Sequence, residues 1–315
     1  MTTSLSCPVC FQDAPHVQTA FISPWIRELS GTKRRKSSYR FCRLCQTGFF
    51  DYRYSYTEMN TIYEDYRGPR YFLTRSRWEP SYTRELDQAL ADDPEVLRFR
   101  HQMILECLAL FDNRLQDSIK TVVDIGGDRG QFIPPVFPNR FVLEASNKSL
   151  VMETKRVESL TEVVSIQPNL VIVSGVLEHL PAPSEFLHEI AKVKSRNNAM
   201  YIYLEVPSGV PKKRTMLSRA LSYISGSIAC RLQPAWVYLD RLSAKRRLLD
   251  KSASRIVPMR QSEHLNFFSE TSLKRLVENS GARICLVDSF RLPVKLSTSS
   301  RLQFSDSIRC LAQVD

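Results

Sequence analysis

The chain has 315 residues, of which 43% are hydrophobic and 24% charged, and its formal net charge is +11. These proportions are ordinary for a soluble globular protein. A membrane-spanning chain is excluded, because no run approaches the roughly 20 apolar residues that a span needs. The first residues have neither a basic start nor an apolar segment, so we expect no secretory signal and a cytoplasmic protein.

Residues 1–52 are predicted to form a zinc-binding module. Cys7 and Cys10 form one C-x-x-C pair, and Cys42 and Cys45 form a second. Each pair can make a tight turn whose thiolates converge, and two such turns supply the four tetrahedral ligands of a structural Zn²⁺ site. The 31 residues between the pairs exceed the commonest spacing. A redox or disulfide pair therefore stays open, as does His16 as a substitute ligand.

Residues 53–120 form a bridge to the remainder of the chain. Its first part concentrates aromatic residues and arginines, among them Tyr63, Tyr66 and Arg75. Apolar residues then recur at helical spacing over residues 94–112, which predicts a helix there.

The most informative pattern begins at residue 121, where a short apolar run holds Asp124. Three glycines, Gly126, Gly127 and Gly130, follow within five positions. A buried strand that ends in such a turn lets a ligand approach the main chain. We expect the N–H groups of the turn, and of a helix behind it, to face that ligand. The next apolar run ends in Glu144, whose carboxylate is placed to accept both hydroxyls of a ribose, so a nucleoside-type cofactor is expected.

Later segments continue the alternation of strands and helices. Strands are expected over residues 169–174 and 199–207, a capped helix within 263–281, and final strands at 286–290 and 308–312, the last as an antiparallel edge. This order predicts an α/β fold with a Rossmann-like, mostly parallel sheet over residues 121–315. Pro134 and Pro135 interrupt the first helix of that domain, which must be one turn or re-form after them.

Residues 209–262 interrupt the predicted core as a basic insert. They hold twelve Lys and Arg against two acidic residues, Asp240 and Asp250. Apolar residues at helical spacing predict one helix from Leu217 to Leu232 and a second after Pro234. We expect these helices above the carboxyl ends of the strands, where open α/β sheets bind ligands, so the insert is interpreted as a substrate lid. The alternative is a solvated basic face without a ligand.

Two motifs resemble those of the class I S-adenosylmethionine-dependent methyltransferases. The first is the acid-glycine pattern from Asp124 to Gly130, which departs from the family at Asp128, the usual middle glycine. The second is the segment that holds Glu178 and His179, which looks like the fourth motif. The resemblance implies S-adenosyl-L-methionine as cofactor. It also implies that the glycines approach the methionine and ribose portions, that Asp124 orders the loop, and that Glu144 takes the ribose. Further cofactor contacts are implied for Glu158, Ser174 and Gly175.

The order of cysteine module, tyrosine-rich bridge and methyltransferase core resembles a group that includes bacterial sugar C-methyltransferases. In that group the bridge covers the cofactor and the substrate. The alternative is that the aromatic residues only pack the two domains together.

An alcohol, amine or carbon acceptor must also lose a proton during methyl transfer. Candidate bases are His179, His264, Glu205 and Tyr203, because all are predicted near strand ends. Histidine titrates closest to neutrality and is the usual proton acceptor.

The leading hypothesis is a methyltransferase for a small anionic acceptor, a nucleotide-linked or phosphorylated sugar or glycan precursor, because the basic insert suits an anion. The alternative is an RNA methyltransferase that grips nucleic acid with the zinc module and the insert. A binding protein on a degenerate scaffold is a third hypothesis. Contact of the insert with an anionic membrane surface is compatible with the first.

Overall fold

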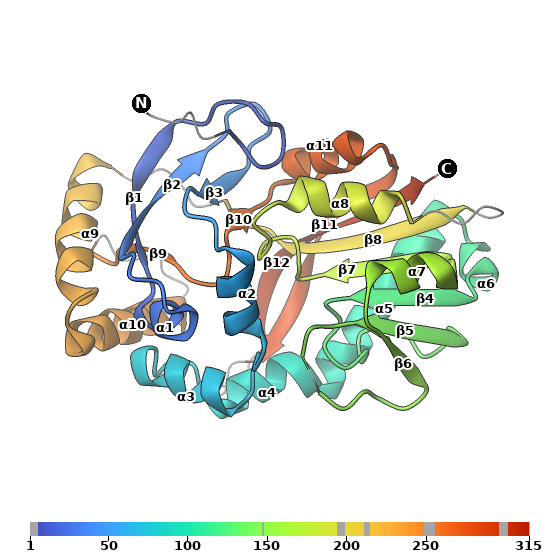
Figure 1. Cartoon of the computed structure of the whole chain (residues 1–315), viewed down its shortest axis with the longest axis horizontal. Helices are drawn as coiled ribbons and strands as arrows, with labels where there is room; N and C mark the ends of the chain where they lie inside the picture. The colour runs from blue at the N-terminus through green and yellow to red at the C-terminus, as the bar shows by residue number, and fades with distance from the viewer. Residues whose placement is uncertain are drawn as a thin grey trace.

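The computed structural model describes residues 6–146, 148–193, 199–210, 215–248, 256–295 and 302–314. Two β-sheets organise them: a sheet of seven strands in the second half of the chain, and a sheet of five strands that begins near the N-terminus (Figure 1). Both sheets take strands from segments that are far apart in the sequence.

The seven-stranded sheet has the order β11-β12-β8-β7-β4-β5-β6. Five neighbouring strands are parallel: β4 (Thr121–Ile125), β5 (Asn139–Leu143), β6 (Thr154–Val157), β7 (Leu170–Ser174) and β8 (Met200–Pro207). β12 (Leu302–Val314) is antiparallel to both β8 and β11 (Arg283–Lys295). The predicted Rossmann-like, mostly parallel sheet is confirmed. The prediction of an edge position for the last strand is wrong, because β12 lies inside the sheet and β11 forms its edge.

Alternating side chains of the core strands are buried on the two faces of this sheet. Val123, Val171 and Val173 pack against α7 (Leu160–Ile166), α8 (Pro183–Ala191) and α11 (Glu270–Ser280). Val122 and Ile172 pack on the other face against α5 (Pro94–Phe111) and α6 (Leu115–Ser118). Strands buried on both faces read as continuous apolar runs, as β4 and β7 do. The helix predicted over residues 94–112 is confirmed as α5.

The helix expected behind the glycine turn is absent. Residues 126–138 form turns and bends between β4 and β5, with Pro134 and Pro135 in their middle. Proline removes a backbone donor and clashes with the preceding turn of a helix. Ile133 and Phe137, both 1% exposed, instead fill the space against α5. The prediction that a helix amino terminus faces the ligand is therefore wrong.

The five-stranded sheet has the order β10-β3-β2-β1-β9. Its central strands come from the cysteine module: β1 (His16–Ile22), β2 (Lys36–Phe41) and β3 (Gly48–Phe50). Of its outer strands, β9 (Met259–Gln261) lies at the end of the insert and β10 (Asn266–Phe267) just after it. β9 pairs parallel to β1, and β10 pairs antiparallel to β3. The end of the insert and the residues just after it thus complete the sheet that the N-terminal residues begin.

Most of the remaining helices lie around this smaller sheet, namely α1 (Pro24–Ser30), α2 (Tyr56–Tyr63), α3 (Pro69–Trp78), α9 (Met216–Ala229) and α10 (Gln233–Leu248). Helix α4 (Arg84–Asp92) instead packs against β11 and α5. α9 packs against β1, and α10 against α9 and α3 (Figure 1). The insert was predicted as a lid above the carboxyl ends of the core strands; its described helices pack on the smaller sheet and on α3, and a lid role stays a prediction. Its residues 211–214 and 249–255 lie outside the described residues. No helix in the described parts of the chain is long and apolar enough to cross a bilayer.

Candidate active site

The turn after β4 follows a path that only left-handed backbone conformations allow. Gly126 and Gly130 have φ angles of 73° and 79°, and Asp128 between them has a φ of 55°. Aspartate is among the few residues that tolerate this conformation, because its short polar side chain bonds locally. Asp128 therefore keeps the path that a glycine would take. A Cβ at Gly126 would lie 2.6 Å from Val176 Cγ2, so this position has no room for a side chain.

Asp124 lies beneath the turn and is 1% exposed. Neither of its carboxylate oxygens has a hydrogen-bond partner among the described residues. Burial and the neighbouring Glu144 raise the pKa of Asp124 well above its ordinary value. A buried carboxylate with two unpartnered oxygens calls for a donor or a cation. The amino group of a methionine moiety at this turn fits that requirement.

Glu144 follows the last residue of β5, on the opposite side of the turn. Its carboxylate accepts the backbone N–H of Asp128 at 3.1 Å and that of Ser146 at 3.0 Å. Each oxygen has a second lone pair free to accept another donor. Lys148 Nζ lies 2.8 Å from Asp128 Oδ1. This ion pair joins the loop after β4, which holds Asp128, to the loop after β5, which holds Glu144 and Lys148. Glu144 is thus fixed by two backbone donors, and its predicted contact with ribose hydroxyls stays a prediction.

A cavity of about 300 Å³ opens between the turn, the ends of β5 and β7, and helix α2. Four residues predicted from the sequence line it together, namely Gly126, Glu144, Gly175 and His179. The other lining residues are Met59, Asn60, Tyr63, Tyr66, Ile125, Leu143, Ala145, Val176, Leu180 and Phe186. The apolar walls, with one held carboxylate, fit a nucleoside cofactor. The bridge covers this cavity through Tyr63 and Tyr66.

Other predicted cofactor residues lie outside the lining of this cavity. Ser174 accepts a hydrogen bond from Arg100 Nη1 at 3.1 Å, and Glu158 is exposed and donates its backbone N–H to Glu162. Gly127 and Gly130 support the turn instead, because a Cβ at either would overlap Asp124 or Thr154. Contacts of Glu158 and Ser174 with the cofactor stay predictions.

Two histidines from distant segments meet beside the cavity. The ring of His179 lies edge-on to that of His264, with 4.6 Å between the ring centroids. Tyr63 Oη lies 2.8 Å from His179 Nδ1. Burial, together with the neighbouring His264, lowers the pKa of His179 to about 3, and burial lowers that of His264 as well. Both imidazoles are therefore neutral near pH 7.

Glu263 adds a charge behind the histidines that the sequence did not single out. Burial alone would raise the pKa of Glu263, but Arg75 and the two histidines lower it to about 2. Arg75 Nη1 lies 3.1 Å from Glu263 Oε1. Tyr71 also donates a hydrogen bond to it. A carboxylate that stays ionised here favours protonation of the neighbouring imidazoles. The signal in the sequence that could have identified Glu263 is its position directly before His264, one of the candidate bases.

Glu205 and Tyr203, the other candidate bases, do not line the cavity. Glu205 is buried at the end of β8, where Arg100 Nη1 lies 3.6 Å from its Oε1. Tyr203 Oη donates to Glu205 at 3.4 Å from the same strand. The sequence pattern placed Glu205 at a strand end correctly, but it carried no sign that α5 brings an arginine to it.

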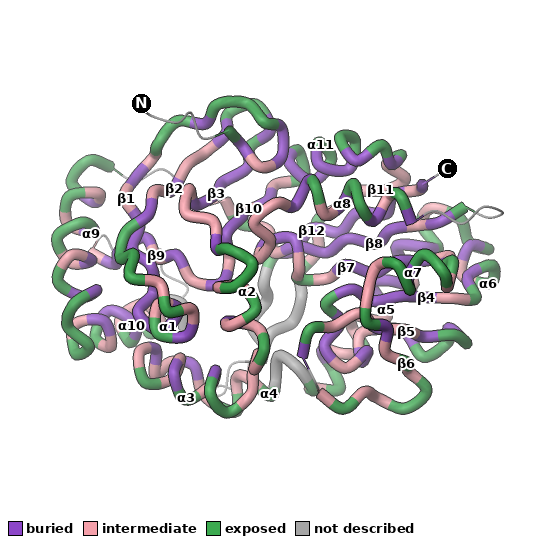
Figure 2. Tube along the Cα trace, in the orientation of Figure 1, coloured by how far each residue is buried: buried purple, intermediate pink, exposed green. Residues whose placement is uncertain are grey.

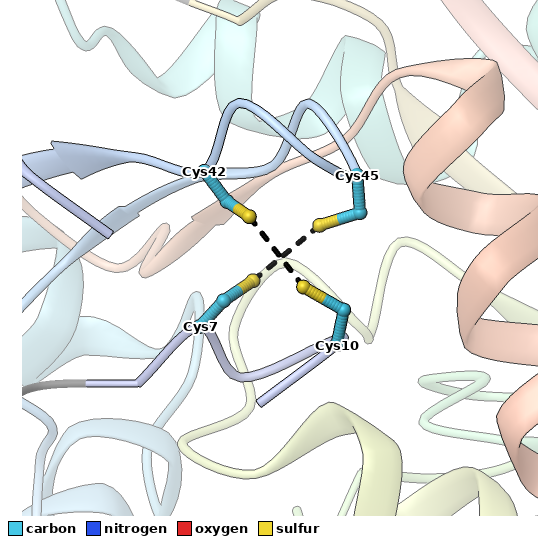
Figure 3. A group of neighbouring side chains, drawn as sticks. All are labelled: Cys7, Cys10, Cys42 and Cys45. Carbon is cyan, nitrogen blue, oxygen red and sulfur yellow. Dashed lines mark hydrogen bonds between the residues drawn. The ribbon is translucent and has the colours of Figure 1, made fainter. Parts of the chain in front are cut away.

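The four cysteines of the N-terminal module converge on one point (Figure 3). All are buried, and their sulfur atoms lie within 4.8 Å of one another. The two turns are alike: Cys7 N–H donates to Gln12 and Cys42 N–H to Thr47, and Phe11 and Gln46 have φ angles of 60° and 61°. Sulfurs around a tetrahedral Zn²⁺ would be about 3.8 Å apart. The sulfurs of Cys10 and Cys42 are 3.4 Å apart, and those of Cys7 and Cys45 are 3.5 Å apart. All four cysteines are free, and His16 is not in the group.

The sheet order, the glycine turn and its two carboxylates define an S-adenosylmethionine-dependent methyltransferase. A family model described as a methyltransferase domain matches residues 99–287. The chain belongs to this family, since the match covers more than half of it.

Solved structures of methyltransferases are similar at low identity. One is the 1,6-didemethyltoxoflavin-N1-methyltransferase of Burkholderia thailandensis, with 12% identity over 90% of this chain and 96% of that one, and a TM-score of 0.43. Another is an S-adenosylmethionine-dependent methyltransferase of Anabaena variabilis, with 9% identity over 76% of this chain and 94% of that one, and a TM-score of 0.41. No curated protein matches the chain.

Proposed function

We propose that the protein methylates a small anionic acceptor, namely a phosphorylated or nucleotide-linked sugar or a related glycan precursor. S-adenosylmethionine supplies, when bound, an activated methyl group with a good leaving group. The chain itself then has to orient the acceptor, exclude water and accept a proton. Asp124, Gly126 and Glu144 are the residues that would hold the cofactor.

The pair of His179 and His264 carries the proposal. Both side chains are neutral at physiological pH, and His179 lines the cavity next to Gly126 and Gly175. We assign His179, which lines the cavity and contacts Tyr63, as the proton acceptor and His264 as its positioning partner. The charge of Glu263 favours the imidazolium that forms, as a carboxylate does for the histidine of hydrolytic triads.

Support for an anionic acceptor comes from the bridge. A pocket of about 240 Å³ beside Asp128 is lined by four cationic side chains, those of Arg67, Arg84, Arg129 and Lys148. The guanidinium of Arg67 lies 5.3 Å from the ring centre of Tyr66, which also lines the cofactor cavity. Three aspartates share the pocket, so one positive charge is in excess. A phosphate group can therefore bind here beside the methyl donor.

A labelling assay tests the proposal. The protein is incubated with S-adenosylmethionine labelled in its methyl group, together with a panel of sugar phosphates and nucleotide sugars and, separately, with total RNA. We expect label in a small molecule, identified by its mass. His179→Gln should lower kcat at least about 100-fold, a larger factor than any rise in the cofactor Kd. His188→Gln, exposed on α8, is the matched control and should have no effect. Label in RNA alone would contradict the proposal and support the RNA alternative.

We also infer that Cys7, Cys10, Cys42 and Cys45 hold a structural Zn²⁺. Four buried thiols on two equivalent turns are the donor set that zinc prefers, and no open position is left for a substrate. A reducing compartment keeps such thiols available to metal, so we infer that the protein works in the cytoplasm.

A further inference from the structure

Helix α9 carries its large apolar side chains on the outside. Its exposed face holds Met216, Leu217, Ile224 and Ile228, which are 49–86% exposed, and Leu232 continues this face beyond the helix end. Its buried face consists of small residues: Ser218, Ser222, Gly226 and Ala229. Positions three, four and seven residues apart share a face, so the two sets lie on opposite sides of the helix. A helix that served only the fold would have the reverse arrangement.

Contacts with β1 fix the orientation of this helix. A Cβ at Gly226 would overlap the ring of Phe21, so glycine lets α9 approach the strand closely. The ring of Tyr223 packs against Phe21 with 6.0 Å between centroids, and Lys36 Nζ donates to Tyr223 Oη at 2.9 Å. The apolar face therefore stays in solvent, and Figure 2 shows α9 on the outer side of the molecule, with exposed stretches along it.

Cationic side chains flank this face. Lys33, Arg34 and Arg35 lie in the connection from α1 to β2, Lys36 is the first residue of β2, and all four are exposed. Lys36 touches α9 through Tyr223. The sequence holds no acidic residue between Glu205 and Asp240. An apolar helix face beside a purely cationic segment matches a surface that is negative outside and apolar beneath.

We propose that this patch, made of Met216, Leu217, Ile224, Ile228 and Leu232 with Lys33–Lys36 beside them, binds an anionic membrane surface. The apolar side chains enter the boundary between headgroups and acyl chains, and the cations bind lipid phosphates. A second copy of the chain is a poorer occupant, because a symmetric contact brings the same cations together. Nucleic acid would pair with the cations but leave the apolar side chains in water. The proposal does not depend on the acceptor proposed above.

Co-sedimentation with vesicles tests it. We expect the full chain to bind vesicles of phosphatidylcholine with phosphatidylglycerol, and to bind pure phosphatidylcholine at least about tenfold more weakly. Ile224→Glu with Ile228→Glu should lower the partition coefficient on anionic vesicles at least about tenfold. Lys33→Gln with Arg35→Gln should lower it too, and should flatten its dependence on salt.

The matched control replaces exposed apolar residues elsewhere. Leu110→Glu with Val164→Glu changes side chains that are 64% and 45% exposed on α5 and α7, and it should leave vesicle binding unchanged. Melting temperature and cofactor binding confirm that each variant is folded. Absence of binding to anionic vesicles would overturn the proposal, as would an equal loss in the control. Self-association that the Ile224→Glu and Ile228→Glu variant abolishes, without vesicle binding, would assign the face to a second copy instead.

Discussion

Arg53 donates to Asn266 Oδ1 at 2.7 Å, and together these two residues tie the segment of His179 to the segment of His264. The same guanidinium donates to the carbonyls of Leu180 and Pro181 at 2.8 Å. Asn266 Nδ2 donates to Leu180 O, also at 2.8 Å. Residues next to the two histidines are thereby held in one network whose arginine belongs to the N-terminal part of the chain.

Arg53→Ala is expected to impair catalysis without touching the cavity. The substitution leaves these buried carbonyls without a donor, which should lower the free energy of unfolding by about 2–4 kcal/mol. The histidines should also lose their alignment, so that kcat falls more than the cofactor Kd rises. Chemical unfolding, calorimetry and initial rates measure the three quantities. Arg98→Ala, on the exposed side of α5, should leave all of them unchanged. Full activity of Arg53→Ala would show that the network does not position the histidines.

Glu144→Gln is expected to weaken cofactor binding about 10- to 100-fold. The amide keeps the size of the side chain, but it accepts fewer hydrogen bonds and lacks the charge that favours the ribose hydroxyls. Calorimetry with S-adenosylhomocysteine measures the change. Glu185→Gln, exposed on α8, is the control and should bind as the unchanged chain does. Equal affinities of both variants would rule out the ribose role of Glu144.

The left-handed conformation at position 128 gives a prediction about stability. Asp128→Ala should lower the free energy of unfolding about 1–2 kcal/mol more than Asp128→Gly, because alanine is strained at a φ of 55° and glycine is not. At Arg98 in α5 the order should reverse, since glycine is a poorer helix former than alanine. Denaturant unfolding of the four variants compares the two sites. The same order at both sites would contradict the assigned backbone.

The buried histidines predict sensitivity to acid. His179 has a pKa of about 3 in the folded chain against 6.5 ordinarily. Between these values the unfolded chain takes up a proton that the folded chain does not. The free energy of unfolding should therefore fall with falling pH, by up to about 1.4 kcal/mol per unit for this group. His179→Gln should flatten the slope between pH 6.5 and 5, and His188→Gln should not. An unchanged slope in His179→Gln would mean that His179 is not buried as a neutral group.

Zinc removal is expected to destabilise the chain as a whole. Elemental analysis of the purified protein should find one zinc per chain. Cys42→Ser should abolish it and lower the free energy of unfolding by at least about 3 kcal/mol. Cys285→Ser, outside the cluster, should keep the metal. A metal-free protein that melts at an unchanged temperature would exclude a structural role for zinc.

The sequence predicted the parts whose signals are local. β4, its glycines and Glu144 lie next to one another along the chain, so the parallel sheet and the carboxyl ends of its strands bring them to one cavity. The convergence of the four cysteines followed from two short turns in the same way. Pro134 and Pro135 predicted a shortened helix between β4 and β5, and the structure has no helix between these two strands.

The remainder depends on pairings that no local pattern encodes. β9 and β10 span three and two residues, too short for a periodicity to be recognised, yet they decide where the insert lies. Residues Met59 and Asn60 of α2 line the cavity only because the module packs against the core. Glu205 followed the rule for strand ends but is paired with Arg100, which comes from a helix more than 100 positions earlier.

The pairing of β9 with β1 imposes an order on biosynthesis. A nascent chain that has emerged through β3 holds both cysteine turns but neither outer strand of its sheet, and these strands arrive only with residues 259–267. During translation of the long intervening stretch, the exposed edges of β1 and β3 are open to wrong partners. Early binding of metal by the cysteines would keep the three-stranded part of the sheet compact until β9 and β10 leave the ribosome. Expression of the first 52 residues alone should accordingly yield an aggregation-prone fragment.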